Sequence, residues 1–144
     1  MPYSPVFQLG VFNGTRDIEL TQQIMTVMLD MLTAVDELEL RAYPHLPLLY
    51  RSGVKYYREP FGDDPWQDVL TTLSVGYGDC EDFAAWRAAE LRVRYGIAAV
   101  CEFHHLITDK MQHKFHIFVR YPDGRLEDPS AILGMKPPSE DSNG

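Results

Sequence analysis

The chain has 144 residues, with 21 acidic and 13 basic side chains and a net charge of −8. This length fits one domain with a sizeable core, and an apolar content of 45% is ordinary for a globular protein. The acidic balance argues against a nucleic-acid partner, and the lack of any long apolar run argues against a membrane span.

The first residues, MPYSPVFQLGVFNG, contain no basic segment followed by an apolar one. We therefore expect no signal peptide and a cytoplasmic location, or a virion-associated one if the chain is encoded by a phage. Without a secretion signal, the two cysteines, Cys80 and Cys101, are expected as reduced thiols, with Cys101 in the core.

The N-terminal half is expected to be mainly helical. Residues 1–15 resemble an irregular arm with aromatic and apolar anchors, and a helix is predicted over 17–35. Its predicted buried face follows the spacing of three and four residues; it comprises Ile24, Met28, Met31, Leu32 and Val35. A long connection rich in proline and tyrosine follows, with a short strand expected at 54–57.

Two further helices are predicted around the glycine-rich segment SVGYG. The first runs over 65–73, with Asp64 as N-cap, Pro65 at the first helical position and Gln67 in a capping box. The second begins at Cys80, where Asp79 is the expected N-cap and Asp82 completes a capping box. Small residues on one face of this helix favour a close neighbour, and Gly96 is the expected stop.

The period then changes from helical to extended. Three antiparallel strands are predicted over 97–107, 114–121 and 125–128. In the middle strand, Ile117 and its alternate neighbours face one side, while His116 faces the other. Helices followed by a small sheet give an α+β fold in a single domain over 1–135, with a helical arm and connection over 1–63, a core over 64–135 and a flexible tail over 136–144.

Cys80 is the first candidate for chemistry. A thiolate at a helix N-terminus is stabilised by unsatisfied backbone N–H groups and the helix dipole, and the same groups can hold an oxyanion. The acids Asp79, Glu81 and Asp82 would disfavour a thiolate if they faced it, and their expected roles are capping and pairing with bases. From these residues alone, a nucleophile and a structural cysteine are equally supported.

A cysteine nucleophile needs a base, and the base needs a group that orients it. His116 is the best-placed base, and Asp128 in the following EDPS segment could lie beside it. The alternative is a structural histidine and an aspartate that opens a turn. A metal site built from Cys80 and two histidines is a weaker alternative, because the spacings match no compact Cys/His pattern.

Four segments follow one another in a specific order: GYGDCEDFA, RYGIAA, FHIFVRY and LEDPS. This order resembles the transglutaminase-like branch of the papain-like cysteine enzymes, over residues 65–132, and the small size resembles the compact microbial and phage-associated members. The resemblance implies a papain-like core whose small antiparallel sheet carries the histidine and the aspartate. It places the nucleophile, base and orienting acid on Cys80, His116 and Asp128.

The resemblance also implies a side-chain donor for the oxyanion. Gln67 is one candidate, although helix capping suits it better, and Trp66 or Tyr77 could line the same cleft. The expected function is a cysteine-dependent hydrolase or acyl transferase that acts on a peptide or protein substrate, with no metal or organic cofactor. The alternative is a non-catalytic binding or structural module on the same fold, for example a phage assembly component with a phage or bacterial protein partner.

Overall fold

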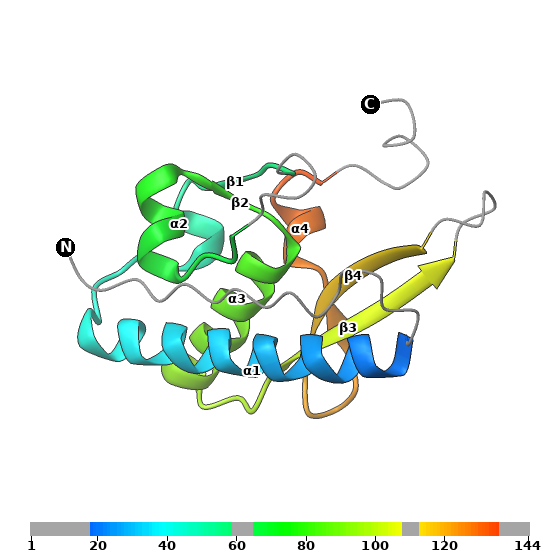
Figure 1. The fold of residues 1–144 in the computed structure, drawn as a ribbon. Helices are drawn as coiled ribbons and strands as arrows, with labels where there is room; N and C mark the ends of the chain where they lie inside the picture. Colours follow the sequence, from blue (N-terminus) through cyan, green and yellow to red (C-terminus); the bar gives the residue numbers. More distant parts are fainter. Residues whose placement is uncertain (1–17, 59–64, 108–112, 136–144) are drawn as a thin grey trace.

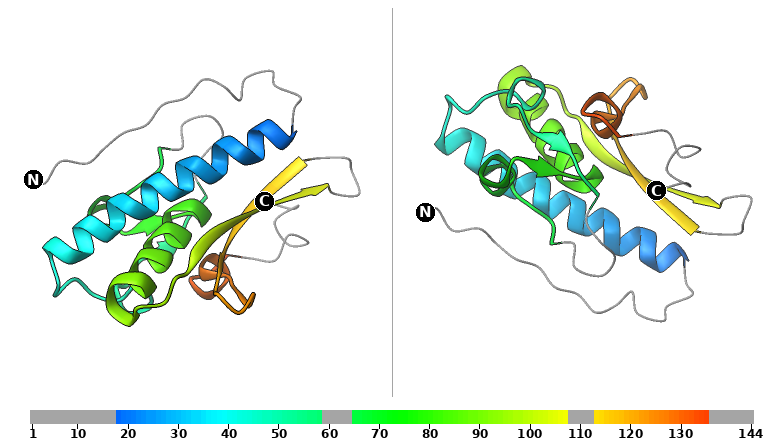
Figure 2. Two further views of the ribbon diagram at one scale, coloured as in Figure 1. Left: turned by 90° about the horizontal axis from the view of Figure 1, so that it is seen from below. Right: turned by 90° about the horizontal axis from the view of Figure 1, so that it is seen from above.

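The computed structural model describes residues 18–58, 65–107 and 113–135, and Figures 1 and 2 show how its elements are arranged. Within this part of the chain, four α-helices accompany a three-stranded antiparallel sheet and a short parallel pair of strands. The predicted α+β class is thereby confirmed. None of the described helices has an apolar stretch long enough to cross a membrane.

Helix α1 is longer than predicted and buries a different face. It spans Ile18–Ala42, whereas the sequence pattern predicted an end near Val35. Of the five predicted core positions only Leu32 is buried, and Met31 is 42% exposed. The buried positions are Leu29, Leu32, Thr33, Asp36, Glu39 and Leu40. The prediction was wrong because apolar periodicity does not show that two carboxylates are buried by contacts with another helix.

Those two carboxylates cap helix α2, which spans Val69–Val75. Asp36 Oδ1 accepts the backbone N–H of Val69 at 3.0 Å, and Glu39 Oε1 accepts that of Leu70 at 3.0 Å. Asp68 is the N-cap and accepts the N–H of Thr71 at 2.9 Å. Three acids therefore satisfy three N–H groups that the helix itself leaves unpaired.

The predicted start of α2 was wrong by four residues. Pro65 precedes the helix and is exposed, and Asp64, the predicted N-cap, lies outside the described residues. The N-cap is instead Asp68, because α1 places its own acids against the next two N–H groups. The helix ends at Gly76, whose φ of 86° lies in the left-handed region that glycine adopts without strain.

The connection before α2 contains a short 3₁₀ helix, η2, at Leu49–Arg51 and the strand β1 at Lys55–Tyr56. The predicted strand at 54–57 is therefore confirmed in a shorter form. Its partner was not predicted: β2, Tyr77–Gly78, pairs with β1 in parallel directly before the next helix. The pairing places the end of the glycine-rich segment, Tyr77–Gly78, next to the connection between α1 and α2.

Helix α3, Cys80–Tyr95, lies behind α1 (Figure 1) and contacts α1, η2, α2, β3, β4 and α4. It begins and ends where the sequence predicted, with Asp79 as N-cap and Gly96 as C-cap. Two core clusters meet on it. The first joins α1, α3 and the sheet, with members Leu29, Leu32, Ala84, Ala85, Ala88, Leu91, Ala99, Cys101, Ile117, Val119 and Tyr121. The second joins α3 to η2 and α2, with members Leu40, Leu49, Val54, Val69, Phe83, Trp86 and Ala89.

The sheet consists of β3 (Val100–Ile107), β4 (His113–Arg120) and β5 (Leu126–Glu127), in that order and antiparallel. The predicted alternation in β4 is confirmed. Ile117 and Val119 are buried in the first core cluster, and His116 lies on the opposite face. Helix α4, Pro129–Ile132, follows β5 directly, with Asp128 as its N-cap.

A polar network fixes β5 against α3. Glu127 accepts hydrogen bonds from the hydroxyls of Tyr50 and Tyr121 and from Arg87 Nε, the last at 2.7 Å. Arg87 also pairs with the buried Glu90 at 2.7 Å. Because Glu127 precedes Asp128, this network holds the end of β5, and with it the candidate acid, in place.

Candidate active site

Cys80 is the first residue of α3, and the predicted capping box is present on both sides of it. The Asp79 side chain accepts the N–H of Asp82, and Asp82 Oδ2 accepts the N–H of Asp79 at 3.1 Å. Cys80, Glu81 and Asp82 form the first turn of α3, where backbone N–H groups point out of the helix end. Cys80 is half-buried and packs with Trp66 against the first core cluster.

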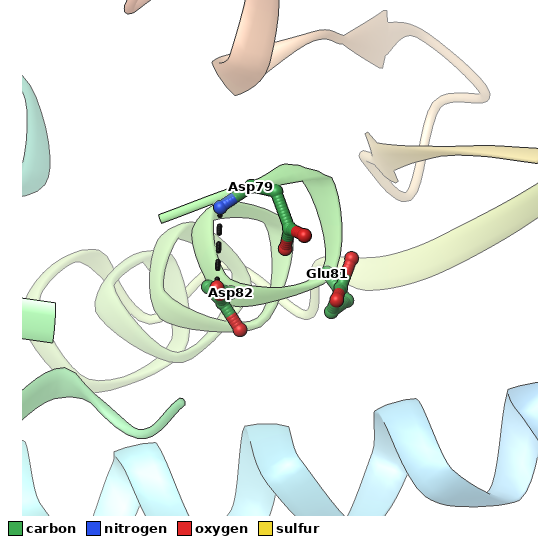
Figure 3. Close-up of side chains that lie close together, drawn as sticks. All are labelled: Asp79, Glu81 and Asp82. Carbon is green, nitrogen blue, oxygen red and sulfur yellow. Dashed lines mark hydrogen bonds between the residues drawn. The ribbon is translucent and has the colours of Figure 1, made fainter. Parts of the chain in front are cut away.

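Three carboxylates surround this first turn: Asp79, Glu81 and Asp82 (Figure 3). All three are buried. Asp79 and Asp82 cap the helix as predicted. Glu81 differs from the prediction, because within the described chain it forms no ion pair with a base. The Cys80 thiol instead donates to Glu81 Oε2 at 3.3 Å.

The environment of Glu81 strongly favours its protonated form. Burial raises the pKa of Glu81 well above its ordinary value, and the neighbouring Cys80, Asp79 and Asp82 raise it further. A protonated Glu81 carries no charge, so it does not repel a negative sulfur. The sequence offered no sign of this role, because nothing local distinguishes a buried glutamate from a solvated one.

The same three carboxylates lie close enough to hold a cation. One oxygen from each falls within 4.8 Å of the others, and carboxylate oxygens are the ligands that Ca²⁺ and Mg²⁺ prefer. Hydrogen bonds of the capping box already use oxygens of Asp79 and Asp82. Among the described residues this is the one such cluster, and the alternative of Cys80 with two histidines does not assemble there.

His116 and Asp128 lie together, as their predicted roles require. His116 Nε2 is 3.0 Å from both Asp128 oxygens, and the side chains are 15% and 26% exposed. Burial alone would raise the pKa of Asp128, but the His116 contact and two backbone N–H groups outweigh it and lower the pKa. Within the described chain, the other ring nitrogen of His116, Nδ1, has no hydrogen-bond partner.

His116 shares its face of the sheet with Phe118 and His104. Phe118 lies edge-on to it with centroids 4.8 Å apart, and His104 is its cross-strand partner in β3. His104 Nε2 is 2.7 Å from Glu102, which also pairs with Arg120 at 3.0 Å. Strand alternation places Glu102 on the same face of β3 as His104, but it does not show that this face lies beside His116, because that depends on the register with β4. His105 lies on the other face against Phe115, and the side chain of His113 lies outside the described set.

The three candidates for the oxyanion site and cleft lie near the start of α3. Gln67 is buried; its backbone N–H donates to Asp82 Oδ1 at 2.7 Å, and its Nε2 donates to the Tyr77 carbonyl at 2.9 Å. Gln67 therefore links the entry of α2 to the capping box of α3. The Tyr77 ring lies edge-on to Tyr57 with the ring centroids 5.3 Å apart, and Trp66 is half-buried and packs against the first core cluster, as Cys80 does.

The elements that carry the three candidate catalytic residues pack together. Cys80 itself contacts the first core cluster, which contains Ile117, the neighbour of His116 on β4. Asp128 caps α4, which packs against α3. No family model, curated protein or solved structure matches the chain.

Proposed function

We propose that this chain is a cysteine-dependent hydrolase or acyl transferase that cleaves peptide or carboxamide bonds on a papain-like, transglutaminase-like core. The observation that carries the proposal is the His116–Asp128 pair, 3.0 Å apart, on a strand packed against the helix that begins at Cys80. The order of the sequence segments around these residues supports the same assignment.

The hydrogen bond of Asp128 determines which nitrogen of His116 acts as the base. A carboxylate at Nε2 keeps a proton on that nitrogen and leaves the lone pair on Nδ1. Nδ1 then takes the proton of the Cys80 thiol, and the sulfur attacks the substrate carbonyl carbon. The protonated His116 donates to the leaving amine as the C–N bond breaks, which gives a thioester. Water or an amine then attacks the thioester and releases Cys80.

The negative oxygen formed during attack needs hydrogen-bond donors. The backbone N–H groups in the first turn of α3 provide them, because they point out of the helix end and carry the positive end of its dipole. Gln67 supports this turn through Asp82 and Tyr77 and does not need to contact the substrate. A protonated Glu81 can reverse its hydrogen bond and donate to the thiolate, which lowers the electrostatic cost of forming it.

Thiol reactivity tests the proposal without knowledge of the substrate. Iodoacetamide and a panel of peptide electrophiles are applied to the folded chain, and the modified cysteine is mapped by mass spectrometry. Cys80 is expected to react much faster than free cysteine, and His116→Gln to slow it. His104→Gln is the matched control, because His104 lies on the same face of the sheet without contacting Asp128. A Cys80 no more reactive than free cysteine would contradict the catalytic assignment.

Cys101 provides an internal reference in the same experiment. Burial raises the pKa of Cys101 to about 12, so its thiol stays protonated and inert in the folded chain. Cys80→Ala should therefore abolish labelling and any turnover while the fold is retained. Full turnover by Cys80→Ala on a substrate that the parent cleaves would exclude the mechanism.

A second candidate is a non-catalytic binding or structural module on the same fold, such as a phage assembly component. The observation that favours it is the hydrogen bond from Cys80 to Glu81, since a thiol that donates this hydrogen bond keeps its proton and is a poor nucleophile. Slow labelling of Cys80 that His116→Gln leaves unchanged is the result expected for this alternative.

A further inference from the structure

Helix α1 carries a second apolar row on its solvent side. The row comprises Leu20, Ile24, Val27, Met31, Ala34 and Leu38, in alternating steps of four and three residues. Four of these side chains are substantially exposed: Leu20 by 46%, Val27 by 58%, Met31 by 42% and Leu38 by 69%. We call this row the outer stripe.

The outer stripe lies opposite the side of α1 that faces the core. At about 100° per residue, Val27 and Met31 fall about half a turn from Leu29 and Asp36 around the helix axis. Figures 1 and 2 show α3 and the β3–β4 hairpin on one side of α1, which leaves the opposite side of the helix uncovered by other described elements. Single exposed apolar residues are common, but a continuous row over most of a 25-residue helix is the mark of a contact surface.

The charges beside the outer stripe indicate which kind of segment could cover it. Glu19, Asp30 and Glu37 lie along one edge of the stripe. Glu37 pairs with Arg41 at 3.6 Å and with Arg92 of α3 at 3.1 Å, whereas Glu19 and Asp30 form no ion pair within the described residues. Two copies of this helix packed stripe to stripe would bring their acidic edges together in an antiparallel pair. In a parallel pair, the same acids would face the apolar Met28 and Val35. A suitable occupant is therefore apolar and free of acids.

Residues 1–16, which lie outside the described part, have this composition. The segment contains no acid, and Arg16 is its one charged side chain. Its apolar residues are Met1, Tyr3, Val6, Phe7, Leu9, Val11 and Phe12. Sixteen extended residues reach ~50 Å, more than the ~37 Å length of α1, so a single reversal before Ile18 would suffice. Because the segment is covalently attached, closing so short a loop costs little entropy.

We propose that residues 1–16 fold back along α1 and cover the outer stripe of their own chain. The apolar residues of this segment pack on the stripe, and Arg16 adds a positive charge near the acidic edge. The segment thereby shields a surface that would otherwise promote association. This inference is independent of the catalytic proposal, since it involves neither Cys80 nor the sheet.

Photo-crosslinking in the full-length chain tests the proposal directly. Val27 is replaced by p-benzoylphenylalanine in one protein, and Leu38 in another in case the first fails to fold. Asp123, exposed in the turn between β4 and β5, is replaced as a control. On irradiation, the stripe positions should crosslink within the monomer to residues of the 1–16 segment, whereas the control should not.

Substitutions in the segment then test whether its apolar residues make the contact. Phe7→Ser with Phe12→Ser should reduce the crosslink yield to the level of the Asp123 control, and Gln8→Ser with Asn13→Ser should leave it unchanged. Crosslinks that appear in a covalent dimer would overturn the proposal in favour of a second copy. A stripe that crosslinks no more than the control would overturn it as well.

Discussion

The buried acids at the junction of α1 and α2 make the stability of this protein depend on pH. Glu39 is 8% exposed and accepts the N–H of Leu70, and Asp36 and Asp82 are buried near Asp68 in the same region. Burial, followed by a side-chain hydrogen bond with Asp68, raises the pKa of Glu39 from 4.5 to about 8. Burial and the nearby acids also raise the pKa of Asp36.

The direction of the effect follows from proton binding. The folded chain keeps the Glu39 proton up to a pH of about 8, whereas the unfolded chain releases it near 4.5. Between these values the folded state binds more protons, so raising the pH favours unfolding. One such proton changes the free energy of unfolding by ~1.4 kcal/mol per pH unit. From about pH 6 to about pH 8 the loss is at most about 2 kcal/mol for Glu39, because residual solvent contact weakens the shift.

Urea unfolding across this pH range measures the effect, and Glu39→Gln isolates it. Glutamine keeps an oxygen for the Leu70 N–H but cannot ionise. The variant should therefore lose less stability than the parent as the pH rises. Asp30→Asn, exposed on the same helix, is the matched control and should keep the parental slope. A parent whose stability is flat or rises over this range, or a Glu39→Gln variant with an unchanged slope, would refute the reasoning.

Two further substitutions test the packing that positions the candidate site. Gly78→Ala would place a Cβ 3.0 Å from Phe83 Cε1 and 3.2 Å from Asp82 Cβ. It should reduce the free energy of unfolding by about 1–3 kcal/mol in urea titrations, and no loss would mean that the capping turn yields easily. Glu127→Gln should cost about 1–3 kcal/mol by leaving Arg87 with one carboxylate partner in place of two. A neutral result would show that Glu90 alone satisfies Arg87.

Local signals were sufficient for α3 and the hairpin. Asp79, Asp82 and Gly96 mark the ends of α3 through their own hydrogen bonds and dihedral preferences, and the structure confirms both ends. The alternation around His116 also placed the correct side chains on each face of β4. These features depend on residues within a few positions of one another, so a single sequence contains the information.

Contacts between distant segments were not predictable in the same way. The start of α2 and the buried face of α1 depend on Asp36 and Glu39, which are 33 and 31 residues away in sequence from the residues whose N–H groups they accept. Polar residues on a long helix are expected in solvent, so their burial leaves no periodic signature. The parallel pairing of β1 with β2 was missed for a similar reason, since neither strand exceeds two residues.

In the candidate site, too, local features were predictable from the sequence and contacts between distant segments were not. The sequence by itself determined that Cys80 begins a capped helix and that His116 lies on the polar face of a strand, because both follow from local spacing. Only the tertiary structure decided that Asp128 lies 3.0 Å from His116 and that the buried Glu81 accepts the thiol of Cys80. These contacts form only when the helices and strands pack against one another. The same packing buries Glu81, and burial is the main cause of its raised pKa.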